Sequence, residues 1–221
     1  ISTVTIGGYF EPGSILGAKV TYTVNDRISF GMMLGNPYSL AYGQNTNMTG
    51  ILFFNYQPLK NLSFTYNNFF GNQALKKATI ENNLLYNNVI LTWAPFKQLE
   101  LAGQFDFSFQ TNSKMAPDTN KTAGMYSGFI QARYPFAEKL SITARYEFFN
   151  DRHGFLTGIN TLTNRGIKTN GLTASFEYKP VKYVYLRMAY RYLEGYKGSK
   201  LFDSNSSDVM QALIFSAGVR F

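Results

Sequence analysis

Apolar and polar residues alternate along most of this sequence, and that period of two constrains the fold more than any other feature. Residues 140–149 and 172–179 are two clear runs, and the apolar positions of the first are Leu140, Ile142, Ala144, Tyr146 and Phe148. Successive side chains of a strand point to opposite faces, so each run predicts a β-strand with one apolar and one polar face. No stretch has a helical period, and no apolar run approaches the roughly 20 residues that a membrane helix needs.

Turn-forming residues divide the sequence into about twelve such runs, which we treat as one domain of 221 residues. The run over residues 1–10 is the least regular, because Gly7 and Gly8 interrupt it and a loop fits the same residues. The expected strands are 1–10, 15–24, 27–36, 49–58, 62–73, 84–96, 99–112, 123–136, 140–154, 170–180, 184–198 and 210–221.

The connections between these strands alternate between short and long. Tight turns are expected at 25–26, 59–61, 97–98, 137–139 and 181–183, and longer polar loops at 37–48, 74–83, 113–122, 155–169 and 199–209. A proline precedes each of the last four tight turns, where a residue that cannot donate a backbone hydrogen bond is tolerated. These prolines are Pro58, Pro95, Pro135 and Pro180. A hairpin thus repeats with its tight turn always on the same side, which predicts an antiparallel up-and-down meander.

Closing this meander into a barrel removes the unpaired edges that would otherwise invite aggregation. A soluble barrel or sandwich turns its apolar faces inward, whereas a barrel in a bilayer turns them outward. Several expected strands reach the roughly 9–11 residues that cross a bilayer at a tilt. Aromatic residues gather near both strand ends, as at Trp93 beside a tight turn and Phe109 beside a long loop. Charged residues make up only 15%, against about 25% in soluble domains, so we expect an all-β transmembrane barrel.

The loop pattern matches bacterial outer-membrane barrels, which have short periplasmic turns and long external loops. An even number of strands then places both termini in the periplasm. Phe215, Ala217, Val219 and Phe221 share one face of the last strand, which resembles the C-terminal signature of outer-membrane barrels. Phe221 is therefore a predicted assembly signal, with the barrel-assembly machinery as a partner during insertion.

The polar faces of the expected strands would line the barrel interior, and eight basic and four acidic residues lie on them. Glu177 and Arg187 are equidistant from a tight turn, so we expect a cross-strand ion pair within a charged ladder that includes Arg145, Glu147 and Arg191. Such a lining fits a pore that favours anions, and it equally fits a structural network that fills a narrow barrel. The predicted pore-lining residues are Lys19, Arg133, Arg145, Glu147, Glu177, Lys179, Arg187, Arg191 and Arg220, and Arg27, Glu100 and Asp106 complete the charged set.

No catalytic, metal or cofactor site is expected. The sequence contains no Cys, and His153, its one histidine, has Asp151 nearby but no serine close after it and no partners at metal-ligand spacing. Nucleic acid is not an expected partner, because the basic residues are divided among lumen, turns and loops. Contact with lipopolysaccharide and plain solvation both fit the lysines of the external loops, which are Lys76, Lys77, Lys197 and Lys200.

Three segments in the second half resemble a known family. Residues 144–155 contain R-Y-E followed by D-R-H-G-F, residues 172–180 contain T-A-S-F-E-Y-K-P, and residues 186–192 read L-R-M-A-Y-R-Y. In this order they resemble the OmpL-like β-barrel porins of Gram-negative bacteria, Bacteroidota versions above all. Residues 11–19 and 22–27 fit as well, so the resemblance extends from about residue 11 to residue 221.

The resemblance implies an outer-membrane porin without catalytic residues or cofactors. Members of the family are usually longer, so it also implies that this sequence lacks N-terminal strands of a larger barrel. Two functions remain open: passive diffusion of small hydrophilic solutes with a tilt towards anions, or a non-conducting structural or accessory subunit of a larger outer-membrane complex. The expected partners are outer-membrane lipid, including lipopolysaccharide, and other outer-membrane proteins.

Overall fold

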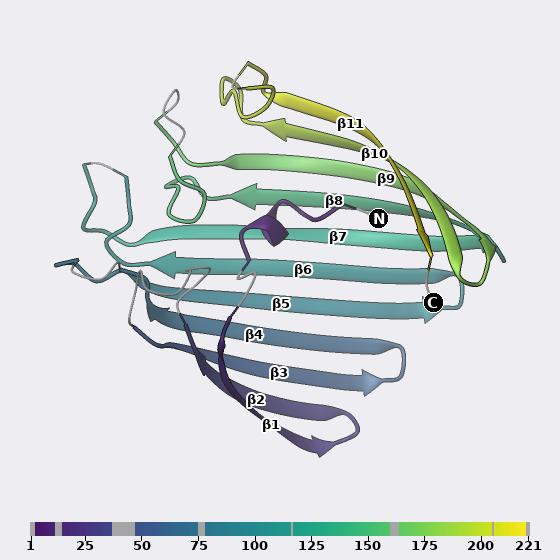
Figure 1. Ribbon diagram of the computed structural model, residues 1–221, viewed down its shortest axis with the longest axis horizontal. Coiled ribbons are helices and arrows are strands. Elements are labelled where there is room, and N and C mark those ends of the chain that lie inside the picture. The colour runs from purple at the N-terminus through teal and green to yellow at the C-terminus, as the bar shows by residue number, and fades with distance from the viewer. Residues whose placement is uncertain are drawn as a thin grey trace.

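The computed structural model describes residues 3–11, 15–36, 47–74, 78–115, 117–159, 164–204 and 206–219. These residues form one sheet of eleven strands, in which each strand pairs antiparallel with the next along the chain (Figure 1). A short 3-10 helix, η1 (Gly7–Tyr9), precedes the sheet. The strands are β1 (Gly17–Asn25), β2 (Ile28–Gly35), β3 (Thr49–Leu59), β4 (Leu62–Asn72), β5 (Asn83–Phe96), β6 (Leu99–Gln110), β7 (Ala123–Ala137), β8 (Leu140–Asn150), β9 (Lys168–Val181), β10 (Val184–Gly195) and β11 (Val209–Val219).

The predicted up-and-down meander is confirmed, because the order of strands in the sheet is their order in the chain. The prolines lie where the regular pairing of each hairpin ends. Register shifts occur beside Pro58, Pro95, Pro135 and Pro180, at the tight-turn ends of β3, β5, β7 and β9. A proline cannot donate to the ladder, so regular pairing gives way to a turn at these positions.

The two faces of the sheet have the opposite burial to that of a soluble protein. On β8 the polar side chains of Ser141 and Thr143 are buried. The apolar side chain of Ile142, which lies between them, is exposed, and so is Tyr146 further along the strand. We call the polar face the inner face, because the N-terminal segment (Thr3–Glu11) lies against it and crosses β6–β8 (Figure 1). The outer face is apolar, with Ile130 on β7 67% exposed. An exposed apolar face of this extent fits the lipid of a bilayer, as expected for a transmembrane barrel.

The inner face has a buried apolar level near the long-loop end of the strands. Eight buried apolar side chains pack together there, seven from the strands and one, Ile6, from the N-terminal segment. Each such side chain contributes roughly 1.5–3 kcal/mol by its burial, so this level of the interior is a packed core. We call it the apolar cluster, and it consists of Ile6, Ile51, Phe69, Leu84, Tyr86, Met125, Phe149 and Leu193.

The described strands do not close into a complete barrel. β1 and β11 each pair with one neighbour, β2 and β10 respectively. Both strands run from the long-loop end to the tight-turn end, so a direct pairing between them would be parallel. Antiparallel closure therefore requires one further strand of the opposite direction between β1 and β11.

The strand expected over residues 1–10 is wrong for the part that the structure describes. Residues 3–10 hold only η1 and irregular chain, and they lie inside the sheet's curve instead of at its edge (Figure 1). The loop that Gly7 and Gly8 also allowed is the better description, and the other expected strands agree with the structure to within a few residues. The even strand count behind the expected periplasmic N-terminus is therefore not met by the described residues.

Some predictions concern residues outside the described ranges. Arg220, Phe221, Lys76 and Lys77 are among them, and their predicted roles stay predictions. Within the described ranges, no helix is long and apolar enough to cross a membrane.

Candidate functional site

The inner face carries the charged side chains that the sequence predicts to line a pore. Alternation along each strand and the contacts described below place eight of the nine predicted residues on this face. At the edge of the sheet, the ammonium group of Lys19 lies 4.2 Å from the centre of the Phe53 ring. The eight residues are Lys19, Arg133, Arg145, Glu147, Glu177, Lys179, Arg187 and Arg191.

Glu147 is the centre of a buried ion cluster at mid-height of the inner face. Its Oε1 accepts hydrogen bonds from Arg145 Nη2 at 3.3 Å and from Arg191 Nη2 at 2.9 Å, and the residue is 1% exposed. Gly171 on the intervening strand makes room for it, because a Cβ at Gly171 would lie 2.9 Å from Glu147 Cγ. We call Arg145, Glu147 and Arg191 the Glu147 cluster. A buried carboxylate of this kind is stable only while its charged partners are present.

The Glu147 cluster holds the N-terminal segment in the interior. The backbone N–H of Ile6 donates to Glu147 Oε2 at 2.7 Å. Arg145 donates to the Thr3 carbonyl oxygen at 2.9 Å and to Thr3 Oγ1 at 2.8 Å. Because charged groups take part in all three hydrogen bonds, each is stronger than an ordinary backbone bond.

Close packing adds to these hydrogen bonds. A Cβ at Gly7 would lie 2.6 Å from Ser127 Oγ, so a residue with a side chain could not approach β7 as Gly7 does. The Phe10 and Phe149 ring centres are 5.0 Å apart, and Ile6 is only 7% exposed within the apolar cluster. The N-terminal segment therefore occupies part of the lumen, at the level where solutes would pass.

A second polar network holds the C-terminal end of the N-terminal segment, at Glu11. Asp106 on β6 is 1% exposed and accepts hydrogen bonds from Asn88 Nδ2 at 2.6 Å and Ser127 Oγ at 2.8 Å. Gln104 Nε2 donates both to Asp106 and to the Glu11 carboxylate. The segment is thus joined to β6 as well as to β8.

Glu177 is the centre of a more open ion cluster near the tight-turn end. Arg187 pairs with its Oε2, while Arg133 Nη2 and Lys179 Nζ each lie 3.4 Å from its Oε1. Arg133 also reaches Glu100 Oε1 at 2.7 Å. We call Arg133, Glu177, Lys179 and Arg187 the Glu177 cluster. The Lys179 side chain is 49% exposed, so this cluster meets water and the Glu147 cluster does not.

The expected pairing of Glu177 with Arg187 is confirmed by their register and by the ion pair. The expected ladder of five charged residues is divided into two clusters instead. One uncharged row separates them, formed by Thr143, Ser175 and Ala189 on adjacent strands. The two clusters therefore differ in environment, and only one of them faces open water.

The loop that follows β8 is held by a residue whose role the sequence analysis missed. Asp151, 0% exposed, accepts hydrogen bonds from the backbone N–H groups of Phe155, Leu156 and Thr157 at 2.9–3.2 Å. An Asp whose side chain caps the following N–H groups is a common turn device, and that signal was available in the sequence.

His153 lies in the same loop. Its pKa is lowered by burial and by the positive charges of Lys114 and Arg152, so the imidazole is neutral at pH 7. Within the described ranges, no group of three or more His, Asp or Glu residues could hold a metal ion.

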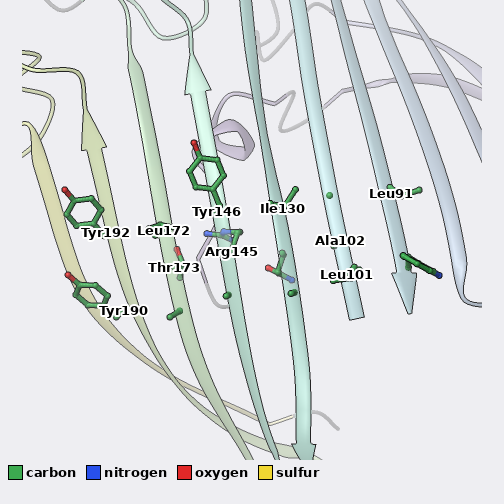
Figure 2. Close-up of a pocket in the computed structure, with 16 residues that line it drawn as sticks. Leu91, Leu101, Ala102, Ile130, Arg145, Tyr146, Leu172, Thr173, Tyr190 and Tyr192 are labelled. Atoms are coloured by element: carbon green, nitrogen blue, oxygen red, sulfur yellow. The ribbon is translucent and has the colours of Figure 1, made fainter. Parts of the chain in front are cut away.

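The outer face has a shallow apolar groove of about 920 Å³ across β5–β10 (Figure 2). Its floor is a row of register partners with small side chains, Ala132, Ala144 and Ala174. Tyr146 and Tyr190 are among the aromatic residues beside it. The exposed tyrosines point away from the interior, so this outer groove belongs to the lipid-facing surface and not to the pore lining.

Comparison with protein families gives a match that covers nearly the whole chain. Residues 8–221 match the family described as "Putative beta-barrel porin-2, OmpL-like". A search of curated protein sequences finds no match.

Two solved porin structures are similar to this one. The NanC porin has 8% identity and a TM-score of 0.52, with 92% of this chain and 91% of that chain covered. OccAB1 of Acinetobacter baumannii has 13% identity and a TM-score of 0.56, with 92% of this chain and 56% of that chain covered. At such identities the likeness concerns the fold, which is that of outer-membrane barrels.

Proposed function

The chain belongs to the OmpL-like β-barrel porin family and is a channel protein rather than an enzyme, and from this premise we propose that it conducts small hydrophilic solutes with a preference for anions. The proposal places it in the outer membrane of a Gram-negative bacterium of the Bacteroidota type. The tight turns and both termini face the periplasm, and the N-terminal segment enters the lumen from that side. The barrel-assembly machinery inserts the chain, with Phe221 as its signal, and one further antiparallel strand closes the barrel.

The Glu177 cluster is the observation that supports anion preference. Three cations surround one carboxylate there, and the second acid nearby, Glu100, pairs with Arg133 alone. The cluster therefore has an excess of positive charge at the tight-turn end of the interior, where it meets water. A ring of positive charge attracts anions and repels cations in a narrow aqueous path. By contrast, Arg191 is engaged with Glu147 and buried, so it contributes structure rather than selectivity.

The filled level of the interior favours a second candidate function. The apolar cluster and the N-terminal segment together occupy the long-loop end of the lumen. A barrel filled in this way would conduct nothing and would act as a structural or accessory subunit among other outer-membrane proteins. The first candidate requires the N-terminal segment to leave this position, at least for part of the time.

Single-channel recording distinguishes the two candidates. The purified protein, inserted in a planar bilayer with a salt gradient, is expected to give discrete openings and a reversal potential of the sign that anion flow produces. A folded barrel that stays silent, also after removal of contacts to the N-terminal segment, would support the accessory function instead.

A charge-removing variant tests the residues that carry the selectivity. Replacing Lys179 and Arg187 with glutamine is expected to move the reversal potential towards zero, because two of the three cations of the Glu177 cluster are lost. The matched control is K197Q/K200Q, which removes the same charge from exposed residues at the long-loop end. Equal reversal potentials for all three proteins would remove the Glu177 cluster from the proposal.

A further inference from the structure

A cationic hollow on the outside of the barrel, at its long-loop end, is not used by the proposed channel. It has a volume of about 320 Å³ and includes three cations that converge on it, Arg152, Arg165 and Lys168. None of the three forms an ion pair within the described ranges. We call it the rim hollow, and it is lined by Asn150, Arg152, Arg165, Gly166, Lys168 and Tyr196.

Two acids near the rim hollow are engaged elsewhere, and a third, Glu194, is exposed on the same face. Asp151 is buried and caps three backbone N–H groups. Asp118 pairs with Lys121 at 2.8 Å. Glu194 accepts a hydrogen bond from the Tyr192 hydroxyl at 3.3 Å and forms no ion pair within the described ranges. The three cations therefore outnumber the one unpaired acid, Glu194, and the rim hollow keeps an excess of positive charge.

Tyr196 is the aromatic residue that lines the rim hollow. The Tyr196 hydroxyl oxygen is buried and has no hydrogen-bond partner in the described part of the chain. The Arg165 guanidinium lies over the ring of the same tyrosine, 5.9 Å from its centre.

The rim hollow faces the membrane side and not the lumen. Asn150 and Lys168 are register partners on neighbouring strands. Asn150 follows the buried inner-face residue Phe149, and Lys168 precedes the buried inner-face residue Thr169, so both lie on the outer face. The amide of Asn150 donates to the Tyr126 hydroxyl at 2.6 Å, in the aromatic band near the long loops. Solutes on their way through the pore would not meet these side chains, whereas headgroups of the outer leaflet would.

The outer groove lies below the rim hollow on the same strands, and one row of outer-face residues, Phe148, Asn170 and Glu194, separates the two. The groove includes Tyr146, Leu172 and Tyr192, and the rim hollow begins four residues further along each strand, at Asn150, Lys168 and Tyr196. Four residues of strand span about 13 Å. Figure 2 shows the groove side chains Tyr146, Leu172 and Tyr192 on neighbouring strands. An apolar groove below a cluster of cations on the same strands matches a lipid with acyl chains and an anionic headgroup.

We propose that the rim hollow and the outer groove together bind one outer-leaflet lipid, with its headgroup phosphate among Arg152, Arg165 and Lys168 and an acyl chain in the outer groove. Arginine pairs bidentately with phosphate oxygens, and lysine adds a point charge. The chemistry identifies a phosphorylated glycolipid of the lipopolysaccharide type, since such a lipid supplies phosphate and acyl chains at this depth of the membrane.

The test measures binding of diphosphorylated lipid A to the purified, detergent-solubilised protein. The variant R152Q/R165Q/K168Q is expected to bind it on the order of 100-fold more weakly than the wild type. The matched control K60Q/K97Q/K139Q removes three exposed lysines from the opposite, tight-turn end and is expected to bind like the wild type. The lipid without its phosphates is expected to bind all three proteins equally weakly.

A second variant tests the acyl chain and separates the two sources of phosphate. A144W fills the floor of the outer groove and is expected to weaken lipid A binding while leaving the rim hollow intact. Inorganic phosphate, added as a competitor, is expected to displace the lipid only at far higher concentration. Equal lipid binding by wild type and the rim variant would overturn the site. Equal affinity for inorganic phosphate and lipid, with no effect of A144W, would overturn the lipid assignment.

Discussion

Replacing Ile6 with aspartate is expected to raise the single-channel conductance several-fold. Ile6 is 7% exposed in the apolar cluster, and its N–H lies 2.7 Å from Glu147 Oε2. A carboxylate at this position would be buried among apolar side chains and close to a second carboxylate, at a cost of several kcal/mol. Each of the three hydrogen bonds between the N-terminal segment and the Glu147 cluster contributes at most about 1.5–3 kcal/mol. The lost apolar burial and the new repulsion together should therefore free the segment from the lumen.

Two controls make this result specific to the position of the segment. V4D places the same charge on the same segment at a side chain that is 49% exposed, and it is expected to conduct like the wild type. The chain contains no Cys, so a cysteine pair can lock the segment without side reactions. A Cβ at position 7 would lie 3.2 Å from Ser127 Cβ, somewhat less than the roughly 3.5–4.5 Å of a disulfide. The substitution S127C also removes the Oγ that a side chain at position 7 would meet, so G7C/S127C can serve as the lock after a small outward shift of residue 7.

The lock is combined with the opening substitution in I6D/G7C/S127C. In the oxidised protein the conductance is expected to return to the wild-type level, and a reductant in the bath should raise it again. If I6D conducts like the wild type, and I6D/G7C/S127C conducts equally in the oxidised and reduced states, the N-terminal segment does not restrict the pore. The apolar cluster alone would then account for the restriction.

The strands and hairpins could be predicted because their causes are local. Alternation along residues 140–149 is visible in the sequence, and the proline before each tight turn fixes where a strand reverses. Glu177 and Arg187 are equidistant from the tight turn at 181–183, which predicts that they pair, and the structure has the same register. A period of two and a known turn are sufficient to determine which side chains face each other.

The position of the N-terminal segment could not be predicted because its causes are distant. Val4, Ile6 and Phe10 alternate as they would in a strand, so the local pattern favours a twelfth strand. Contacts with Glu147, 141 residues away in sequence, hold the segment in the lumen instead. The one local sign was the Gly7-Gly8 pair, since Gly7 approaches Ser127 more closely than a residue with a side chain could. The rim hollow is likewise formed by residues from three separate strands and their loops.

Replacing Glu147 with leucine is expected to lower the free energy of unfolding by about 3–5 kcal/mol, because two buried guanidinium groups would lose their shared counter-charge. Arg145 and Arg191 are 5% and 6% exposed, so water cannot take over the role of the carboxylate. Unfolding in urea, followed by the change in electrophoretic mobility between folded and unfolded barrel, measures the difference. E100L is the matched control, and because the Glu100 side chain is 52% exposed, a loss of at most about 1 kcal/mol is expected.

A triple variant distinguishes the charge imbalance from the lost volume of the carboxylate. In R145M/E147L/R191M all three charges are gone, and side chains of similar size fill the same space. Buried ion clusters replaced as a whole by apolar side chains often recover or exceed the original stability. The triple variant is therefore expected to unfold at a urea concentration closer to the wild type than E147L does. It also removes the groups that hold Thr3 and Ile6, so it should conduct like I6D although it is stable. A triple variant as unstable as E147L would show that the cluster is needed for more than charge balance.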